Sequence, residues 1–431
     1  MNIDSWGRLG AAPHNLRPLY DPGSAAPILA EGTGLAHGMG RSYGDVCLNP
    51  GGALWATRGL DRFLEFDQEQ GLLRCEAGVL LRDIQQLAVP RGWMLPVTPG
   101  TWFVTVGGAI ANDVHGKNHH RQGTFGDHVQ SLVLQRTDGQ QLECNREVHA
   151  DWLSATVGGL GLTGLVTEAC LQLRPVTGPL LEVETHPFEN LEQFYRLSEE
   201  SEESWEYAVA WIDCVHPRKR RGIFLRANHS QTPGVDQNEP VRQLGLPLTP
   251  PLSLVNRLTL RPFNAAYYHW HRLHAGSSVS HYRSFFYPLD SIARWNRMYG
   301  PRGFYQYQCL IPGSDTQAVV EELISATSRA RSGSFLAVLK TFGDRPAAGM
   351  LSFPAEGTTL ALDFPNRGDD TLALFGRLDA IVESAGGKIY AAKDARMPRQ
   401  LFESGYPGLA AFLDYRDPGV SSGLSRRLLG S

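Results

Sequence analysis

The stretch that most constrains the fold is residues 94–120, MLPVTPGTWFVTVGGAIANDVHGKNHH, which combines a Pro-Gly turn, a Gly-Gly pair and several histidines. Gly107 and Gly108 lack a Cβ atom, so their backbone can approach a flat or phosphorylated molecule and present amide groups to it. Side chains that can donate hydrogen bonds surround this pair: Thr105, Asn112, His115, Lys117 and Asn118. An ordinary Gly-rich surface loop is the alternative. The combination favours a loop that binds a nucleotide cofactor.

A second Gly-rich loop spans residues 32–52 and is followed by no amphipathic helix. Its glycines, Gly38, Gly40 and Gly44, are spaced too widely for the dinucleotide-binding fingerprint. A literal Gly-x-Gly-x-x-Gly begins at Gly159, but the residues after it alternate between apolar and polar. That alternation predicts a strand where the fingerprint requires a helix.

The patterns along the chain predict a mixture of strands and helices. Short strands are expected at residues 53–57, 63–67 and 72–78, a helix at 80–89, and a hairpin that turns at Asp138-Gly139. Residues 305–392 read as strand, helix, strand, strand, helix, strand, which is the ferredoxin-like order. The helix at 315–331 is expected to begin with a capping box of Ser314 and Gln317, and the helix at 370–384 to end before Gly386. Residues 230–262 show no sustained period and are predicted to be a mobile loop or lid.

The motifs GMGRSYGD, PVTPGTWFVTVGGAIANDVHGKNHH and ATVGGLGLTGLV, in this order, resemble the FAD-binding domain of the vanillyl-alcohol-oxidase/PCMH superfamily. Within that superfamily HGKNHH, FYQYQ, YAAKDAR and the C-terminal SRRL are similar to the decaprenylphosphoryl-β-D-ribose 2-oxidases, the flavin subunits of an epimerase. The similarity covers nearly the whole chain. HGKNHH and the co-linear order are specific, whereas each Gly-rich loop alone is a weak signal.

The resemblance implies an α+β structure with two domains, a PCMH-type FAD-binding fold and a substrate (cap) domain that contains the ferredoxin-like part. The expected FAD-binding domain comprises residues 1–177 and a C-terminal return at 388–431, and the cap domain comprises residues 178–387. FAD is expected without a covalent bond, because Arg41 stands where many relatives have a flavin-linked histidine. No metal is expected. The predicted FAD-binding residues are His37, Gly38, Met39, Gly40, Arg41, Ser42, Tyr43, Gly44, Asp45, Gly100, Thr101, Thr105, Val106, Gly107, Gly108, Asn112, Val114, His115, Gly116, Asn118, His119, Gly161, Val166, Tyr390 and Ala392.

Side chains on the predicted cap strands suggest a substrate site. A period of two places Gln306 and Gln308 on one face, where they either contact solvent or hydrogen-bond a sugar. Lys340 ends an apolar strand, and its stem could simply snorkel along that surface. Thr359 shares a strand face with Ala361 and Asp363. By the family pattern, the predicted substrate-binding residues are Lys117, Gln306, Gln308, Lys340, Thr359 and Lys393.

The resemblance also implies a reaction, hydride transfer to flavin from the C2 carbon of a polyprenyl-phosphate-linked ribose. A separate NAD(P)H-dependent reductase would then convert the keto sugar to the arabinose epimer. Lys393 is expected between substrate and flavin, with a surface ion pair to Asp394 as the alternative. His115 is a candidate proton acceptor, and Tyr43 or a water molecule are its rivals. A soluble sugar, alditol or aldonolactone oxidase and a noncatalytic flavin subunit remain alternative functions.

Composition excludes some classes and leaves others open. A formal net charge of −4 argues against a nucleic-acid partner, because phosphate binding needs a basic face. The six cysteines contain no C-x-x-C pair, which favours buried thiols in a reducing compartment over zinc or disulfides. No apolar run is long enough to span a membrane, and the N-terminus lacks a signal peptide. The chain is therefore expected in the cytoplasm. The basic run at residues 218–221 is either solvated or makes a peripheral contact with the inner membrane.

Overall fold

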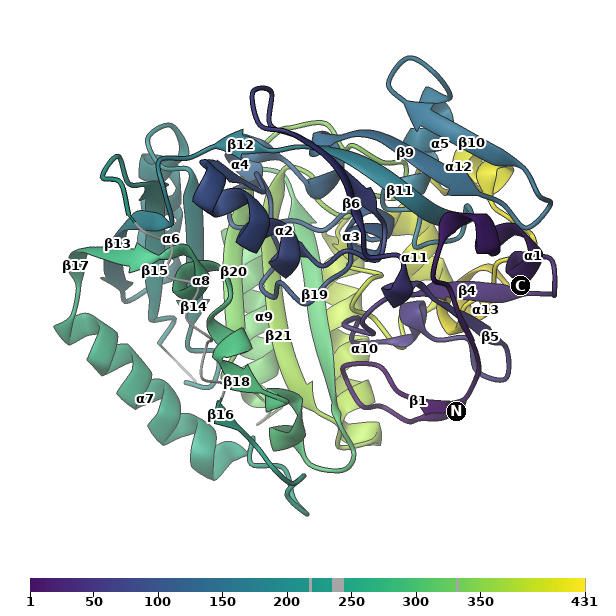
Figure 1. Cartoon of the computed structure of the whole chain (residues 1–431). Coiled ribbons are helices and arrows are strands. Elements are labelled where there is room, and N and C mark those ends of the chain that lie inside the picture. The colour runs from purple at the N-terminus through teal and green to yellow at the C-terminus, as the bar shows by residue number, and fades with distance from the viewer. Residues whose placement is uncertain (217–218, 235–243, 331–332, 431) are drawn as a thin grey trace.

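The computed structural model describes the whole chain except residues 217–218, 235–243, 331–332 and 431. It is a mixed α+β structure in which small N-terminal sheets lie beside one large antiparallel sheet from the C-terminal part (Figure 1). The predicted fold class is confirmed. Among the described helices, none combines the length and apolarity that a membrane span requires.

Two sheets dominate the N-terminal region. The parallel sheet has the order β3-β5-β4, formed by Asn15–Pro18, Ala53–Ala56 and Gly34–His37. The antiparallel sheet has the order β10-β9-β11-β7-β6, formed by Gln141–Asn145, Val129–Gln135, Leu165–Gln172, Leu72–Glu76 and Phe63–Asp67. β11 is thus a strand, as the alternation after Gly159 predicted. The hairpin between β9 and β10 turns at Gly139, whose φ of 89° suits a residue without Cβ.

Short helices and ribbons pack around these sheets. α2 (Leu81–Ala88) buries one apolar stripe against the antiparallel sheet, as its period predicted. α3 (Val106–Ala111) begins at Thr105, whose hydroxyl accepts a hydrogen bond from the Gly108 amide at 3.2 Å. The remaining elements before the large sheet are β1 (Asn2–Ile3), β2 (Ala12–Pro13), α1 (Ala25–Leu29), β8 (Trp93–Met94), α4 (His119–Gln122), α5 (Ala150–Thr156) and β12 (Arg174–Pro175).

The large sheet has eight strands in the order β17-β13-β15-β14-β20-β21-β19-β22. Its second half is the predicted ferredoxin-like unit and is confirmed: β19 (Phe304–Pro312), α9 (Gln317–Arg329), β20 (Ala337–Phe342), β21 (Gly357–Pro365), α10 (Asp369–Ser384) and β22 (Lys388–Ile389). The strand order β20-β21-β19-β22 is the one that this pattern produces.

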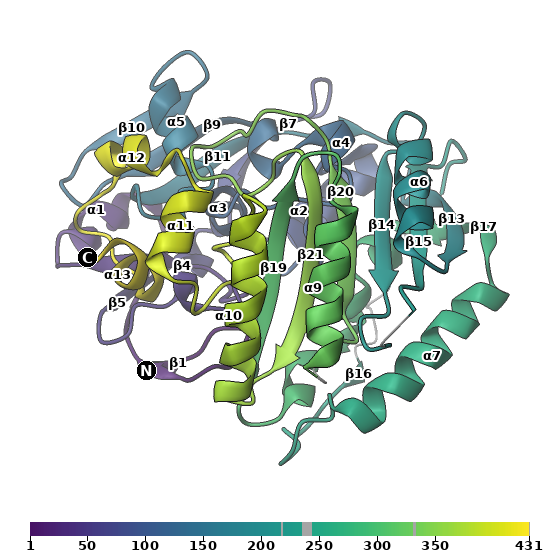
Figure 2. The ribbon, with the colours of Figure 1, turned by 180° about the vertical axis from the view of Figure 1, so that it is seen from behind.

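The first half of the large sheet repeats the same pattern, although no repeat is visible in the sequence. It consists of β13 (Leu180–Phe188), α6 (Leu191–Glu202), β14 (Tyr207–Ile212), β15 (Gly222–His229), α7 (Arg257–Leu273) and β17 (Gly276–His281). The two halves join where β14 pairs with β20. Helices α6, α9 and α10 cover one face of the sheet (Figure 2), and the other face is turned toward the N-terminal region. β16 (Leu244–Gly245) precedes α7, and α8 (Tyr282–Phe286) and β18 (Ile292–Ala293) lie between β17 and β19.

Two local predictions were wrong. The N-cap of α9 is Thr316 and not Ser314, and its hydroxyl contacts that of Thr358 at 2.6 Å instead of capping the helix. The predicted loop 230–262 runs into a helix, because α7 already begins at Arg257 behind an Asn256 capping box. Pro262 lies inside this helix as its sixth residue, so the Leu258 oxygen lacks the usual amide partner four residues on. Residues 235–243 of the same predicted loop lie outside the described part of the chain.

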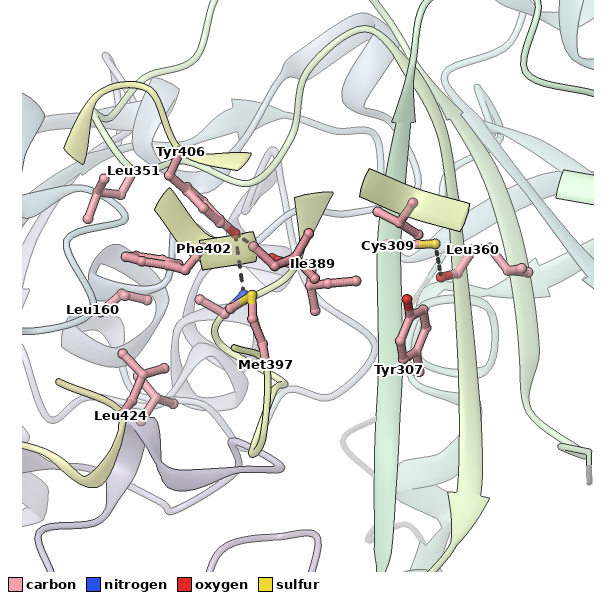
Figure 3. Close-up of a cluster of buried hydrophobic side chains, with 14 of the residues drawn as sticks. Leu160, Tyr307, Cys309, Leu351, Leu360, Ile389, Met397, Phe402, Tyr406 and Leu424 are labelled. Atoms are coloured by element: carbon pink, nitrogen blue, oxygen red, sulfur yellow. Dashed lines mark hydrogen bonds between the residues drawn. The ribbon is translucent and has the colours of Figure 1, made fainter. Parts of the chain in front are cut away.

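The C-terminal segment returns to the N-terminal region. It contains α11 (Arg399–Gly405), α12 (Leu409–Phe412) and α13 (Gly423–Leu429). Side chains from this return share a buried core with β19 and β21 (Figure 3), and the Tyr406 hydroxyl donates to the backbone oxygen of Ile389 at 2.7 Å. Its backbone also meets β4, since the Gly34 amide donates to Gly419 and the Ser421 amide to Gly34. All six cysteines are free thiols, and four of them are buried.

Two glycines allow the Gly-rich loops and the C-terminal return to meet. A Cβ at Gly38 would lie 2.4 Å from the hydroxyl oxygen of Thr105, so the first loop touches the start of α3. A Cβ at Gly44 would lie 1.7 Å from the backbone oxygen of Asp394. A larger residue at Gly44 would therefore require backbone movement, whereas one at Gly38 would displace the Thr105 side chain that caps α3. The loop at residues 38–45 is therefore fixed against both α3 and the segment that carries Lys393.

We expect Gly44→Ala to destabilise the protein by about 1–3 kcal/mol, because the new methyl group meets backbone that cannot rotate away. Gly376→Ala is the matched control, since a Cβ at this exposed α10 position has open space around it. The control should be neutral or stabilising by up to about 1 kcal/mol. Urea unfolding of both variants measures the difference. Equal stability of the two variants would contradict the packing described above.

Candidate active site

A cavity of about 430 Å³ lies between the uncovered face of the large sheet and the N-terminal loops. Its wall combines both Gly-rich loops, the segment after Gly159, and strands β14, β19, β20 and β21. Twenty-five of the predicted residues line it: Gly38, Met39, Gly40, Arg41, Ser42, Tyr43, Gly100, Thr101, Thr105, Gly107, Gly108, Asn112, Val114, His115, Gly116, Lys117, Gly161, Val166, Gln306, Gln308, Lys340, Thr359, Tyr390, Ala392 and Lys393. Residues from five distant segments thus converge on one site.

The other six predicted residues lie behind this wall: His37, Gly44, Asp45, Val106, Asn118 and His119. Several of them hold the loops in place. The His37 ring contacts the backbone oxygen of Cys47 at 2.9 Å, and Asn118 donates to the backbone oxygen of Pro96 at 2.9 Å. Asp45 pairs with Arg427 of α13 at 2.9 Å. These residues shape the cavity from outside it.

The amide groups of the two Gly-rich loops differ in availability. In α3 the Gly107 amide donates to the Ala77 oxygen at 2.8 Å and the Gly108 amide to the Thr105 hydroxyl, so neither is left for a ligand. The sequence predicted that Gly107 and Gly108 would present their amides to a ligand. In the structure their missing side chains instead allow close packing. Within the described residues, the amides of Met39, Gly40 and Arg41 donate to no protein acceptor. Three successive amides of this kind are suited to binding a phosphate group.

Three buried side-chain oxygens on the cavity wall also have no partner among the described residues. They belong to Asn112, Gln306 and Gln308. Burying an unpaired amide oxygen costs about 1–3 kcal/mol, so such groups normally meet a partner. A ligand that donates hydrogen bonds would satisfy them.

His115 lies at the centre of a network on this wall. Its Nε2 atom is 3.0 Å from the Gln308 side-chain nitrogen, and its Nδ1 atom is 3.1 Å from the Lys340 ammonium nitrogen. Phe342 and Tyr390 pack around the ring. Burial and the nearby lysines lower the pKa of His115 well below its usual value. The ring is therefore neutral at neutral pH, and both of its nitrogens are engaged by the protein.

Three lysines line the cavity, namely Lys117, Lys340 and Lys393. The Lys340 side chain donates to the Gly116 oxygen at 2.9 Å, and burial together with Lys393 and Lys117 lowers its pKa well below the usual value. The Lys117 side chain donates to the Phe285 oxygen, and burial lowers its pKa to about 7. Clustered amines of this kind are suited to an anionic ligand group, whose charge would raise the pKa of each.

Lys393 does not lie in the surface ion pair with Asp394 that was the alternative prediction for it. Asp394 instead pairs with Arg427 at 3.0 Å, and the Lys393 amine lies over the Tyr43 ring at 5.4 Å from its centre. Burial lowers the pKa of Lys393 to about 8, while Asp363 opposes this shift. Within the described residues the Lys393 amine donates to no hydrogen-bond acceptor, and it faces the cavity.

Asp363 is the main site residue that the sequence prediction missed. Burial raises the pKa of this carboxyl to about 7, and the Gln306 side chain donates to it at 2.6 Å. The signal was present, because Asp363 follows Thr359 by four residues on the same strand face. Asp363 lies behind the cavity wall, whereas Asp290 lines the cavity and accepts from the Trp102 amide at 2.9 Å. Asp290 lies in a short 3-10 helix that carries no motif.

Beyond the polar residues the cavity continues as an apolar arm. Its walls are formed by side chains from β14, β15, β20, α7 and α8: Val209, Trp211, Leu225, Tyr267, Phe286 and Val338. Trp211 and Tyr267 pack together with their ring centres 4.7 Å apart. The arm therefore ends at the inner side of α7. The cavity thus has a polar part, lined by the glutamines and lysines of β19, β20 and the C-terminal return, and an apolar part beside this helix.

Residues 26–145 match the family described as FAD binding domain. The decaprenylphosphoryl-β-D-ribose oxidase of Mycolicibacterium smegmatis is 35% identical over 98% of this chain and 96% of its own length. An uncharacterised protein of Streptomyces coelicolor is 32% identical over 81% of this chain and 100% of its own length. The L-gulonolactone oxidase of Mus musculus is 30% identical, but over only 32% of this chain and 31% of its own length.

Fold, cavity and comparisons together define a flavoprotein oxidoreductase. The chain belongs to the PCMH-type FAD-binding family. The cavity fits this cofactor, because its wall offers unpaired amides at residues 39–41 and unpaired amide oxygens on Asn112, Gln306 and Gln308. The first set would hold phosphate oxygens, and the second would accept from ring or sugar donors.

We expect Lys117→Met to change stability in a pH-dependent way. Because the pKa of Lys117 is about 7 in the folded chain and near 10.5 in the unfolded chain, the folded state binds fewer protons between these values. The burial cost of the charge is complete below pH 7 and disappears as the pH rises toward 10. The stability of the variant relative to wild type should therefore fall across this window in urea unfolding of flavin-free protein. A constant difference between pH 6 and pH 10 would contradict the assignment.

Proposed function

We propose that this protein oxidises the C2 hydroxyl of a polyprenyl-phosphate-linked ribose to the 2-keto sugar, using FAD. The observation that carries the proposal is the two-part cavity, in which a polar end with glutamines and lysines leads into an apolar arm. A sugar phosphate suits the polar end, and a prenyl chain suits the arm. The full-length similarity to the Mycolicibacterium smegmatis enzyme supports the same substrate class.

The apolar arm is the feature that separates this substrate from a small soluble sugar. A free sugar, alditol or aldonolactone would leave Trp211, Leu225 and Val338 facing water at no benefit to binding. Each CH₂ group of a prenyl chain that is buried against such a wall contributes about 0.8 kcal/mol to the free energy of binding. The similarity to L-gulonolactone oxidase covers only 32% of this chain, so it does not support a shared substrate.

The polar residues would divide the work of binding and orienting the sugar. When bound, FAD supplies the acceptor for the hydride. Gln306 and Gln308 present unpaired oxygens to sugar hydroxyls, and Lys117 and Lys340 lie where they would meet the phosphate. Thr359 holds the Gln308 side chain at 3.1 Å, so the glutamine is positioned before substrate arrives. Tyr390 and Ala392 form the wall between the sheet and the Gly-rich loops.

Lys393 is our candidate for the group that accepts the hydroxyl proton. His115 has both nitrogens engaged by Gln308 and Lys340, so it would have to give up a partner first. Burial raises the pKa of Tyr43 well above 10, which keeps its hydroxyl protonated. Lys117 and Lys340 also have lowered pKa values, but their amines donate to the backbone oxygens of Phe285 and Gly116. The Lys393 amine, with a pKa of about 8, donates to no acceptor among the described residues and is therefore free to take up a proton in its neutral form.

The 2-keto product is an intermediate in an epimerisation, so a second protein must reduce it. We propose a separate NAD(P)H-dependent keto-sugar reductase as the partner. A lipid-linked substrate also places the enzyme at the surface of the inner membrane, on the cytoplasmic side. The basic run at residues 218–221 does not favour the contact predicted there, because Arg220 pairs with Glu321 and Arg221 with Asp213. Arg218 lies outside the described residues.

Anaerobic mixing of the purified flavoprotein with candidate substrates tests the proposal. Polyprenyl-phosphate ribose should bleach the flavin absorbance, whereas ribose 5-phosphate and L-gulonolactone should not at the same concentration. Because the arm adds apolar contacts, lengthening the prenyl chain should lower the half-saturating concentration. Bleaching by the free sugars alone would identify the soluble sugar oxidase instead. Tight FAD binding without bleaching by any of these compounds would favour a noncatalytic flavin subunit.

We expect Lys393→Ala to retain FAD but to slow substrate-dependent bleaching by about two to three orders of magnitude, the range seen for the loss of one catalytic group. In wild type the bleaching rate should rise with pH toward a plateau above pH 8, because the neutral amine accepts the proton. Lys393→Arg should be as slow as the alanine variant, since arginine stays protonated. A rate that falls above pH 8 would show that the ammonium form is needed.

Gln308→Ala should mainly weaken substrate binding, by about 1–3 kcal/mol, because a hydrogen bond to a neutral sugar hydroxyl is lost. The half-saturating substrate concentration would then rise while the limiting bleaching rate changes little. Loss of thermal stability without this change would indicate a purely structural glutamine.

The flavin should be released on acid precipitation, leaving the yellow colour in the supernatant. Arg41, which stands where many relatives carry a linking histidine, stacks over Trp6 at 4.1 Å and cannot form a bond to the flavin. Colour that stays with the precipitated protein would show a covalent link through another residue.

A further inference from the structure

Helix α7 exposes an apolar face that no described part of the chain covers. Eight of the sixteen large apolar side chains that are exposed among the described residues lie within residues 248–279. On α7 itself these are Leu258, Phe263, Trp270 and Leu273, with Leu258 87% and Leu273 83% exposed. Scattered exposed leucines are normal, but a run of this density marks an interaction surface.

The face lies opposite the side by which α7 packs on the protein. At 100° per residue, the buried residues Leu260, Asn264 and Tyr268 share one side of the helix. Leu258 and Leu273 project from the other side, with Trp270 beside them. The helix is thus apolar on its outer surface, where a helix of a soluble protein normally carries charged residues. Figures 1 and 2 show α7 at the periphery of the molecule in both views.

The charged residues of the segment that contains this face are of one sign. Residues 244–289 contain four arginines and no aspartate or glutamate. Three of these arginines, Arg257, Arg261 and Arg272, lie on α7 and are exposed. An outward apolar stripe with flanking arginines is the pattern of a helix that lies in the interface of an anionic bilayer. A second copy of this chain would place like charges against each other across a shared face.

The helix also connects this outer face with the cavity. Tyr267 lines the apolar arm and packs on Trp211, one residue away from the inner packing position of Tyr268. One side of α7 therefore faces the apolar end of the cavity, and the other side is the exposed apolar face.

From these observations we infer that α7 docks the protein on an anionic lipid surface, with Leu258, Trp270 and Leu273 inserted among the acyl chains and its arginines at the headgroups. The inference concerns the surface and not the reaction, so it stands whether or not the proposed substrate is correct. Docking in this orientation places the apolar end of the cavity beside the bilayer.

Flotation of the intact flavoprotein with vesicles tests the inference. Wild type should float with vesicles of equimolar phosphatidylcholine and phosphatidylglycerol and much less with phosphatidylcholine alone. The double variant Leu258→Ser/Leu273→Ser should lower the partition coefficient at least about tenfold, since two largely exposed leucines no longer enter the bilayer. Leu64→Ser/Leu413→Ser is the matched control, because these leucines are exposed on other surfaces and should leave flotation unchanged. Unchanged flavin content and circular dichroism would show that both variants are folded.

Two further measurements separate the alternatives. Replacing Arg257, Arg261 and Arg272 by glutamine should remove the preference for phosphatidylglycerol. Lipids brominated on their acyl chains should quench tryptophan fluorescence in wild type, and Trp270→Phe should lose that part of the quenching. Equal flotation of wild type and the double leucine variant would overturn the inference, as would absence of flotation of wild type. A wild-type dimer in light scattering that the double leucine variant converts to a monomer would assign the face to a second copy of the chain instead.

Discussion

The arrangement of the site depends on backbone contacts that only glycine permits. The first Gly-rich loop touches α3 at Gly38 and the Lys393 segment at Gly44, with no room for a Cβ at either place. These contacts bring together segments more than 300 residues apart and leave the amides of Met39 to Arg41 turned away from protein acceptors. A larger residue at Gly44 would push the loop away from the Lys393 segment, and the unpaired amides of Met39 to Arg41 would shift with it.

Burial of polar groups is the second constraint, and it explains the unusual protonation of the site. Lys117, Lys340 and His115 all have lowered pKa values, chiefly because they are removed from water. Asp363 has a raised pKa for the same reason. Such groups cost stability when the cavity holds no partner for them. Their concentration on one wall, together with unpaired amide oxygens, indicates that this surface is shaped for a ligand and not for packing.

The sequence predicted the parts of the site that follow a simple period or motif. The alternation in β19 correctly placed Gln306 and Gln308 on one face, and the glycine motifs identified both Gly-rich loops that line the cavity. The sequence did not predict that the Gly107 and Gly108 amides are bonded within the protein. One of their acceptors, the Ala77 oxygen, comes from the turn after strand β7, which is distant in sequence. The N-cap of α9 moved to Thr316 since a hydroxyl contact with Thr358 of β21 replaced the expected capping box. In each of these cases contacts with distant parts of the chain decided the local structure. The domain bounds and the roles of individual site residues stay predictions.

The repeat within the large sheet shows that the outer face of α7 is not a requirement of the fold. α7 and α10 are each the second helix of a β-α-β-β-α-β half, and each buries one side against strands. α10 does so on the face that α6 and α9 cover, and α7 does so by Tyr268 on Trp211 and Ile223 at the cavity face. On α10 the exposed positions include Asp369, Asp370, Arg377 and Glu383, as expected for a helix in contact with water. On α7 the corresponding surface carries Leu258, Trp270 and Leu273. Because the same topology accepts a charged exterior in one half, the apolar exterior of the other half needs a cause outside the fold, namely a surface that it contacts.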